Sequence, residues 1–236
     1  MDACITHAQR SSSSRRQLGM SLVELLVGIT IGLFIVAAAS LMVSSQLNDN
    51  RRLLLELQVQ QDLRATADVI ARELRRAGGR KLAAEGVWSE TNLASANPFS
   101  DVTITGAPDN TEVRFNYERG IELPALGFKF VSARGVIQSY IGTDWQDLTD
   151  GNTMEVTGFT VVESESSFDD QRIPCLKACD PLFTNADISC WPKLKVRTYV
   201  IEIIARARTD LRIKRTLRST VGLRNDDYFA AQACPA

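Results

Sequence analysis

One acidic residue beside a long apolar run constrains this chain more than any other feature. From Leu25 to Val43 the sequence holds 19 residues without a charge. At 1.5 Å per residue this run makes about 28 Å of helix, which matches the hydrocarbon thickness of a bilayer. Glu24 directly precedes the run. A carboxylate in an apolar span costs roughly 2.5–3.5 kcal/mol on insertion scales, so Glu24 needs a partner or a function.

The residues before this span are those of a targeting leader. Residues 1–19 are polar, serine-rich and basic, and we exclude them from the fold. Basic residues before a span keep that end cytoplasmic, so the C-terminal part is expected to be exported. A cut after Gly19 would free a cationic amine at Met20, one helical turn from Glu24. That amine, on the same subunit or on a neighbour, is a natural counter-charge for the carboxylate.

Two other interpretations of the N-terminus stay open. An ordinary secretory signal would use Leu25 to Val36 as its apolar core and Ala37 to Ala39 as its cleavage site. Glu24 would then interrupt the apolar core, and the apolar run would continue past the cut. An uncut membrane anchor is the second interpretation. Only processing after Gly19 accounts for both the glycine and the carboxylate.

Beyond the span, the helix is expected to continue as an amphipathic segment to residue 77. No proline interrupts residues 44–76, and apolar residues recur at spacings of three and four. Gly78 and Gly79 provide a stop signal. We expect the stripe to be the face on which a sheet packs, with a coiled-coil seam as the alternative. The stripe consists of Leu55, Val59, Leu63, Ala67, Ile70 and Leu74.

Strand patterns follow a predicted loop over residues 78–101, in which Trp88 is expected to anchor the loop to the domain. The tripeptide Asp150-Gly151-Asn152 predicts a tight turn. The sequence therefore predicts an α+β fold, with a long N-terminal helix packed on an antiparallel β-sheet domain. The predicted strands cover residues 102–105, 113–117, 128–130, 136–141, 159–162, 195–208 and 213–223.

Residues 163–192 form an acidic, serine-rich insertion. With Cys4 in the leader, the remaining cysteines number four, which predicts two disulfides in an oxidising compartment with three possible pairings. A zinc site is the alternative, but the spacings do not form two close pairs. The acidic residues of the insertion fit no EF-hand loop, so a solvated loop is favoured over a calcium site. The four cysteines are Cys175, Cys179, Cys190 and Cys234.

Histidine usage excludes several kinds of catalytic site. The one histidine of the chain, His7, lies in the leader, so the processed chain would lack Ser–His and Cys–His catalysis and histidine-ligated metal sites. The sequence also lacks a nucleophile elbow, a phosphate loop and a dinucleotide fingerprint. We therefore predict that the protein is not an enzyme and holds no cofactor and no metal.

Basic residues gather near the C-terminus. They could contact DNA or acidic faces of neighbouring subunits, but no aromatic residue interrupts residues 206–224, as a nucleic-acid surface would require. An exposed sheet face is favoured, and nucleic acid is not an expected partner. The basic residues are Arg206, Arg208, Arg212, Lys214, Arg215, Arg218 and Arg224.

The segment from Gly19 to Val27 resembles the cleavage and methylation signal of type IV pilins and pseudopilins. It holds a glycine, an apolar residue, a small residue, two apolar residues and a glutamate, followed by an apolar helix. The resemblance implies that a prepilin peptidase cuts between Gly19 and Met20 and N-methylates Met20. Many major pilins carry a proline at the position of Leu41, so a kink there has no support in this sequence.

Three other segments extend the likeness to PilW-type minor pilins. They are Gly32-Leu33-Phe34, the helix end from Ala71 to Gly79, and the late segment from Thr220 to Asn225. Gly28 and Gly32 also form a G-x-x-x-G pair, which suits close helix packing but is also explained by the abundance of glycine in membrane helices.

The resemblance implies a low-copy subunit with a pilin-like fold. It would sit in the inner membrane, in contact with lipid, with a periplasmic C-terminal domain. Through its N-terminal helix it would join other major and minor pilins in a type IV pilus on the cell surface, and prime assembly for motility, adhesion or DNA uptake. A minor pseudopilin of a type II secretion system is the alternative, and a membrane-anchored exported enzyme is a third. The expected segments are a leader (1–19), a membrane and assembly half-helix (20–43), an amphipathic half-helix (44–77) and a globular domain (78–236).

Overall fold

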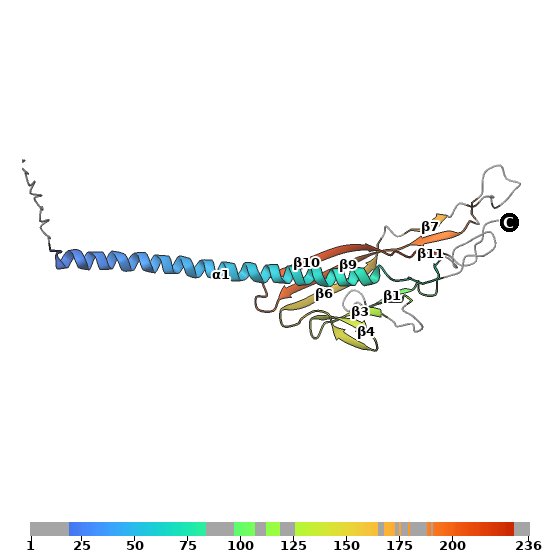
Figure 1. Ribbon diagram of the computed structural model, residues 1–236, viewed down its shortest axis with the longest axis horizontal. Helices are drawn as coiled ribbons and strands as arrows, with labels where there is room; N and C mark the ends of the chain where they lie inside the picture. The colour runs from blue at the N-terminus through green and yellow to red at the C-terminus, as the bar shows by residue number, and fades with distance from the viewer. Residues whose placement is uncertain are drawn as a thin grey trace, which may run out of the picture. The chain divides into compact units, whose positions relative to one another are not determined.

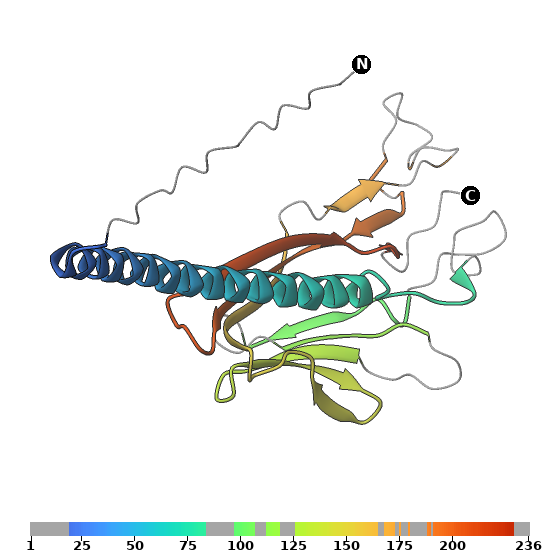
Figure 2. The ribbon, with the colours of Figure 1, turned by 60° about the vertical axis from the view of Figure 1, so that its left-hand side comes forward.

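The computed structural model describes residues 19–83, 97–106, 112–118, 126–164, 168–172, 175, 179, 188–189 and 191–228. The chain divides into two compact units, residues 1–51 and 52–236. One long helix, α1, runs into the second unit, where antiparallel strands form three sheets (Figures 1 and 2). The predicted α+β fold is confirmed.

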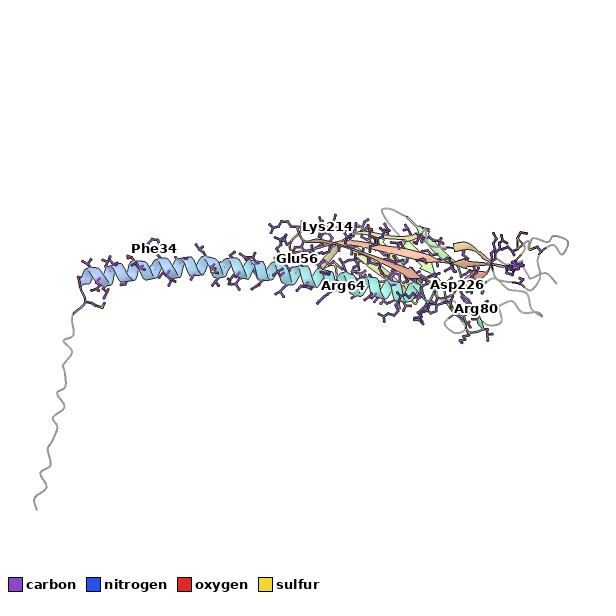
Figure 3. All side chains as sticks on the ribbon, turned by 90° about the horizontal axis from the view of Figure 1, so that it is seen from above. Phe34, Glu56, Arg64, Arg80, Lys214 and Asp226 are labelled. Carbon is purple, nitrogen blue, oxygen red and sulfur yellow. The ribbon has the colours of Figure 1, made fainter. Side chains whose placement is uncertain are left out.

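Helix α1 extends from Leu22 to Leu74, against a prediction of residues 20–77. In its first half the side chains project away from the helix axis, Phe34 among them (Figure 3). After Leu74 the chain tightens, since the Ala77 N–H bonds the Leu74 carbonyl at 3.0 Å. Gly78 then takes a φ of 76°, and its N–H bonds the Asn116 carbonyl at 2.9 Å. Glycine suits this left-handed position, so the predicted stop at Gly78 is confirmed.

The apolar stripe on the second half of α1 faces the sheets, as predicted. Leu55 is partly buried, and the other members of the stripe are buried. The spacing of three and four residues keeps these side chains on one side of the helix. The buried residues of the helix are Val59, Leu63, Thr66, Ala67, Ile70, Ala71 and Leu74.

The first sheet is a five-stranded antiparallel meander in which each strand pairs with the next along the chain. Val113 and Phe115 point inward from the second strand and alternate with partly exposed residues, as the sequence pattern predicted. Four of the strands were predicted, and the short β5 was not. The strands are β1 (Val102–Thr105), β2 (Glu112–Phe115), β3 (Leu126–Val131), β4 (Val136–Ile141) and β5 (Asp144–Asp147).

The second sheet has the order β10-β9-β6, with β6 (Met154–Glu163), β9 (Thr198–Ala207) and β10 (Lys214–Gly222). Strand β9 pairs antiparallel with both neighbours, and the register with β6 shifts between Val156 and Gly158. Such a shift marks a β-bulge, which adds local twist. Along β10 the partly buried Arg215, Leu217 and Ser219 alternate with exposed residues, so these three lie on the inner face of the strand.

The third sheet corrects two predictions. It has the order β11-β8-β7, with β7 (Phe168–Arg172), β8 (Lys193–Val196) and β11 (Asp227–Tyr228). The prediction of one strand over 195–208 is wrong, because the run divides between β8 and β9, which belong to different sheets. The prediction of an irregular insertion over 163–192 is also incomplete, because β7 lies within it. Trp88 lies outside the described residues.

The break between β8 and β9 falls at Arg197, whose side chain is 6% exposed. Its guanidinium donates from Nη1 to the Ser100 carbonyl, and its own carbonyl accepts from the Leu223 N–H at 3.0 Å. Before Arg197 the chain pairs with β7 and β11, and after it the chain pairs with β6 and β10, so a continuous β-pattern in the sequence does not give a continuous strand.

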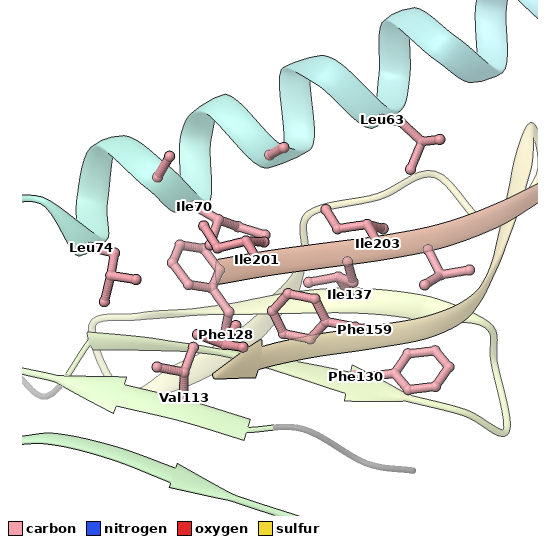
Figure 4. Close-up of a cluster of buried hydrophobic side chains, with 14 of the residues drawn as sticks. Leu63, Ile70, Leu74, Val113, Phe128, Phe130, Ile137, Phe159, Ile201 and Ile203 are labelled. Atoms are coloured by element: carbon pink, nitrogen blue, oxygen red, sulfur yellow. The ribbon is translucent and has the colours of Figure 1, made fainter. Parts of the chain in front are cut away.

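One hydrophobic core joins α1 to the first two sheets (Figure 4). Leu63, Ile70 and Leu74 come from the helix, and Ile201 and Ile203 come from β9. The five-stranded sheet and β6 complete the core with Val113, Phe128, Phe130, Ile137 and Phe159. The second half of α1 is therefore part of the domain core.

Candidate processing and assembly site

The predicted cleavage point lies just before the helix. Gly19 and Met20 are non-helical, and α1 begins at Leu22. Met20 is 69% exposed, so the peptide bond between the two residues lies outside the helix and beside an exposed side chain. This arrangement suits a peptidase, because a helical peptide bond would first have to unwind. Cleavage at this bond stays a prediction.

Ser21 caps the start of α1, a role that the sequence interpretation missed. Its carbonyl accepts the first helical hydrogen bond, from the Leu25 N–H at 3.1 Å. The pattern serine, two residues, glutamate is a capping-box pattern and could have identified Ser21 as the N-cap. Glu24 thus occupies the first turn, where the helix dipole favours a negative charge.

The trunk, defined here as residues 22–43, is the apolar half of α1. It lies in a helix that is long and apolar enough to cross a membrane. Its large side chains are exposed on all sides of the helix, from 48% at Val27 to 79% at Leu22. A helix that is apolar on all sides needs a partner that is equally apolar.

Glu24 is the exception among the polar side chains of the trunk. The Thr30 hydroxyl donates to the Val27 carbonyl at 2.8 Å, and the Ser40 hydroxyl donates to the Val36 carbonyl at 2.8 Å. These hydroxyls are therefore satisfied within the helix, which lowers their cost in an apolar medium. Within the part of the chain that the structure describes, no group donates to the Glu24 carboxylate.

Gly28 and Gly32 face open space in the isolated chain. A Cβ added at either position would meet nothing within 4 Å. The two glycines are four residues apart and therefore lie on one face of the helix. Their lack of side chains serves no contact within the described chain, so a packing role would require a second helix.

The basic C-terminal set is largely paired with carboxylates of the same chain. Arg206 and Arg208 both contact Glu155, at 2.8 and 3.5 Å. The Arg206 hydrogen bonds, more than any other interaction, lower the pKa of Glu155. Two further pairs are Arg212 with Asp210 at 3.0 Å and Arg215 with Glu56 at 2.6 Å. These pairs favour the interpretation of this surface as an exposed sheet face.

The pair of Arg215 and Glu56 links β10 to α1, residues far apart in the sequence (Figure 3 labels Glu56 beside Lys214). Glu56 also accepts from Arg52 at 3.4 Å, one helical turn away. Only the second contact has an i, i+4 spacing that the sequence could have revealed.

A family model described as prepilin peptidase-dependent protein B matches residues 52–223, which is most of the chain. The chain belongs to this family. A second model, the prokaryotic N-terminal methylation motif, matches residues 14–40 and so covers the predicted cleavage point and most of the trunk. Neither the curated proteins nor the solved structures gave a match.

Membership of the prepilin peptidase-dependent protein B family establishes a pilin-like protein that prepilin peptidase processes. The family is structural and not enzymatic, in agreement with the prediction. The methylation motif and the apolar helix are the features of an inner-membrane prepilin. The finer assignment to PilW-type minor pilins stays a prediction.

Two of the cysteines of this prepilin peptidase-dependent protein are described. Cys175 forms a disulfide, and so does Cys179. Cys190 and Cys234 lie outside the described residues, as do several acidic side chains of the insertion, so the pairing of the four cysteines stays a prediction. Among the residues that the structure describes, no cluster of three or more potential ligands could hold a metal.

Proposed function

We propose that this protein is a PilW-type minor pilin of a type IV pilus. It is inserted in the inner membrane with its domain in the periplasm, cut between Gly19 and Met20, and N-methylated on Met20. It then enters the fibre, primes assembly and reaches the cell surface. The observation that carries the proposal is Glu24, the trunk's polar side chain that has no partner within the described chain.

The physical argument concerns what the trunk can enter after the membrane. The apolar trunk can leave lipid only for another apolar environment, and a bundle of like helices provides one. Glu24 would cost several kcal/mol there unless a cation met it. The Met20 amine of a neighbour is such a cation, and pairing it with Glu24 would set the register between major and minor pilins. Gly28 and Gly32 would let two helices approach closely.

The cysteines agree with a domain that is exported to the periplasm. An exported domain meets an oxidising compartment, in which disulfides form and persist. We propose two disulfides among Cys175, Cys179, Cys190 and Cys234, which staple the insertion and the C-terminal tail. Their pairing is open to peptide mapping under non-reducing conditions.

Mass spectrometry of the mature N-terminus tests the processing step. The expected result is a chain that begins with N-methylated Met20. A chain that begins at Ser40, or one with an intact leader, would overturn the proposal. The deletion phenotype tests the destination, because loss of pili supports a minor pilin and loss of type II secretion supports a pseudopilin.

A further inference from the structure

The outer face of the five-stranded sheet carries a different set of side chains from the face that α1 covers. Val113, Phe128 and Ile137 point from β2, β3 and β4 into the core (Figure 4). Successive side chains of a strand alternate between its two faces, so Arg114 and Lys129, which follow two of these residues, lie on the outer face. Both are partly exposed. The outer face is therefore a surface on which charged side chains are within reach of solvent.

One row of residues on this face crosses four strands. Arg114 on β2 lies opposite Gly127 on β3, and Gly127 lies opposite Tyr140 on β4. Tyr140 in turn lies opposite Trp145 on β5. Gly127 leaves room for the Arg114 side chain, since a Cβ on this glycine would lie 3.3 Å from Arg114 Cγ. The guanidinium carbon of Arg114 is 5.2 Å from the ring centre of Tyr140 and 5.2 Å from that of Trp145. The two ring centres are also 5.2 Å apart, so the three groups form one cluster.

Arg114, Lys129, Tyr140 and Trp145 are called the aromatic platform below, and their own contacts hold them in place. Lys129 Nζ lies 4.2 Å from the ring centre of Trp145, and Arg114 also pairs with Glu112. These partners of Trp145 come from β2, β3 and β4, all on one side of the edge strand β5. The indole therefore leans back over the sheet, and Trp145 stays partly exposed. Side chains that are already fixed lose less conformational entropy when a ligand binds.

A polar hollow of about 510 Å³ lies beside the aromatic platform, and its lining includes Arg134, Asp147 and the turn 150–152. Asp147 is two residues from Trp145 and on the same face of β5, roughly 7 Å along the strand. Oδ1 of Asp147 accepts from Arg134, and Oδ1 of Asp150 accepts a backbone N–H of its own turn at 2.8 Å. Within the described residues, Oδ2 of each carboxylate has no hydrogen bond. These two oxygens can therefore accept hydrogen bonds from a ligand.

The charges of this surface favour a neutral ligand over a polyanion. Its cations and its carboxylates are equal in number, so a nucleic acid would meet as much repulsion as attraction. A neutral sugar combines the two chemistries that the surface offers. Its C–H faces stack on aromatic rings, and its hydroxyls donate to carboxylates and accept from cationic groups. The charged groups are Arg114, Lys129 and Arg134 against Glu112, Asp147 and Asp150.

We propose that the aromatic platform and the polar hollow together bind a neutral β-1,4-linked glycan. One sugar ring stacks on Trp145, and the next ring of the chain places its hydroxyls against Asp147 and Asp150. In β-1,4-linked glucose or N-acetylglucosamine, every ring substituent is equatorial, so both faces of each ring are C–H surfaces suited to stacking. The proposal goes beyond the assembly role and does not depend on it, because the glycan site lies on the sheet face opposite α1.

Saturation-transfer NMR tests the site on the full-length protein, in a detergent without sugar head groups. The probes are chitotetraose and cellotetraose, and the expected result is transfer to the ring C–H protons of at least one of them. Trp145→Ala should weaken binding about tenfold or more, whereas Trp145→Tyr keeps an aromatic ring and should stay within about threefold of wild type. Gln146→Ala is the matched control, because Gln146 is the exposed neighbour whose side chain points to the other face of β5. It should bind as wild type does.

Two results of this experiment would overturn the proposal. One is the absence of transfer to either sugar at about 10 mM, tenfold above a dissociation constant of about 1 mM. The other is wild-type binding by Trp145→Ala. Thermal unfolding of each variant shows whether the substituted chain still folds, and Trp145→Tyr provides the comparison if the alanine variant does not.

Salt dependence separates a glycan from a nucleic acid. Sugar affinity should change by less than about twofold between about 50 and 200 mM salt, because a neutral ligand releases no counterions. A twelve-residue oligothymidylate should bind more weakly than the better sugar at both salt concentrations. Tighter binding of the oligonucleotide, with a steep loss of affinity as salt rises, would overturn the proposal and assign the aromatic platform to single-stranded nucleic acid.

Failure of the glycan site can be told apart from failure of the pilus role. A wild-type chain that binds a sugar through Trp145 but is absent from sheared pili would disprove the pilus role and retain the site. A chain that is present in pili but binds neither sugar would disprove the site and retain the role.

Discussion

Arg206 on β9 lies opposite Glu155 on β6 and donates two hydrogen bonds to its carboxylate. Nε donates to Oε2 at 3.0 Å, and Nη2 donates to Oε1 at 2.8 Å. These hydrogen bonds lower the pKa of Glu155 below its ordinary value of 4.5, and the charges of Arg206 and Arg208 act in the same direction. A lowered folded-state pKa means that the ionised carboxylate stabilises the fold above its unfolded-state pKa. That contribution is lost as the pH falls through the lowered folded-state value.

Glu155→Gln should therefore destabilise the domain modestly at neutral pH and progressively less below pH 4.5. The free energies of unfolding of wild type and variant, measured in denaturant from neutral to acidic pH, test this. The curves should converge at the acidic end. A constant gap at all pH values would mean that the charge of Glu155 contributes nothing.

Leu63→Ala should destabilise the domain by about 2–5 kcal/mol, because it leaves a cavity between α1 and the sheets. Leu63 is 1% exposed and belongs to the main core cluster. Leu57→Ala is the matched control, since Leu57 is 56% exposed on the same helix and should change the stability of the unassembled chain little. Denaturant unfolding measures both. Equal losses of unfolding free energy in the two variants would show that Leu63 contributes no more to the core than the exposed Leu57 does.

Gly78→Ala should destabilise the helix end by about 1–3 kcal/mol, because it combines a left-handed backbone with crowding. At a φ of 76°, a Cβ on Gly78 would lie 3.3 Å from Asn225 Cβ and 3.3 Å from Asn97 Nδ2. Gly142→Ala isolates the backbone cost, since Gly142 has a φ of 68° and open space around it. Thermal unfolding compares the two variants, and Gly78→Ala should lose more.

Glu24→Gln should be inserted and cut normally but should enter pili at a level lower by about tenfold or more, since the ion pair with a neighbour's Met20 would be lost. Glu56→Gln is the control, a helical carboxylate that already contacts Arg52 and Arg215 within the chain. Immunoblots of sheared pili and of membranes give both levels. Incorporation of the Glu24→Gln chain at the wild-type level would disprove the proposal that Glu24 sets the register between subunits.

Gly28→Leu combined with Gly32→Leu should also reduce incorporation, because the added side chains would hold neighbouring helices apart. The isolated chain has room for them, so membrane levels should not change. Ala38→Leu adds bulk at a trunk position outside the glycine pair and serves as the control. Equal incorporation of all three chains would favour the simple explanation that glycine is common in membrane helices.

Periodicity predicted the helix and most strands because these elements bury one face each. The α1 stripe and the alternation around Val113 and Phe115 both follow directly from which side chains avoid water. The methylation signal was equally visible, since its residues are contiguous and act locally.

Tertiary contacts decided what the sequence did not predict. An apparently continuous β-run divides at Arg197 because β8 pairs with β7 and β11, whereas β9 pairs with β6 and β10. Strands β5, β7 and β11 have polar sequences without apolar alternation. They form strands because they pair with neighbouring strands, which the sequence pattern does not reveal. The Glu56–Arg215 pair and the double use of Glu155 were invisible for the same reason.

The central position of β9 also sets an order of events during biogenesis. Ile70 on α1 packs near Ile201 on β9, close to the end of the chain (Figure 4). Because the chain is synthesised from its N-terminus, the helix is made long before the strand that covers it. During that interval its inner stripe is open to water, and contacts of such wide sequence separation form slowly. Prompt closure of the last hairpin, between β9 and β10, would then determine how much of the protein escapes aggregation.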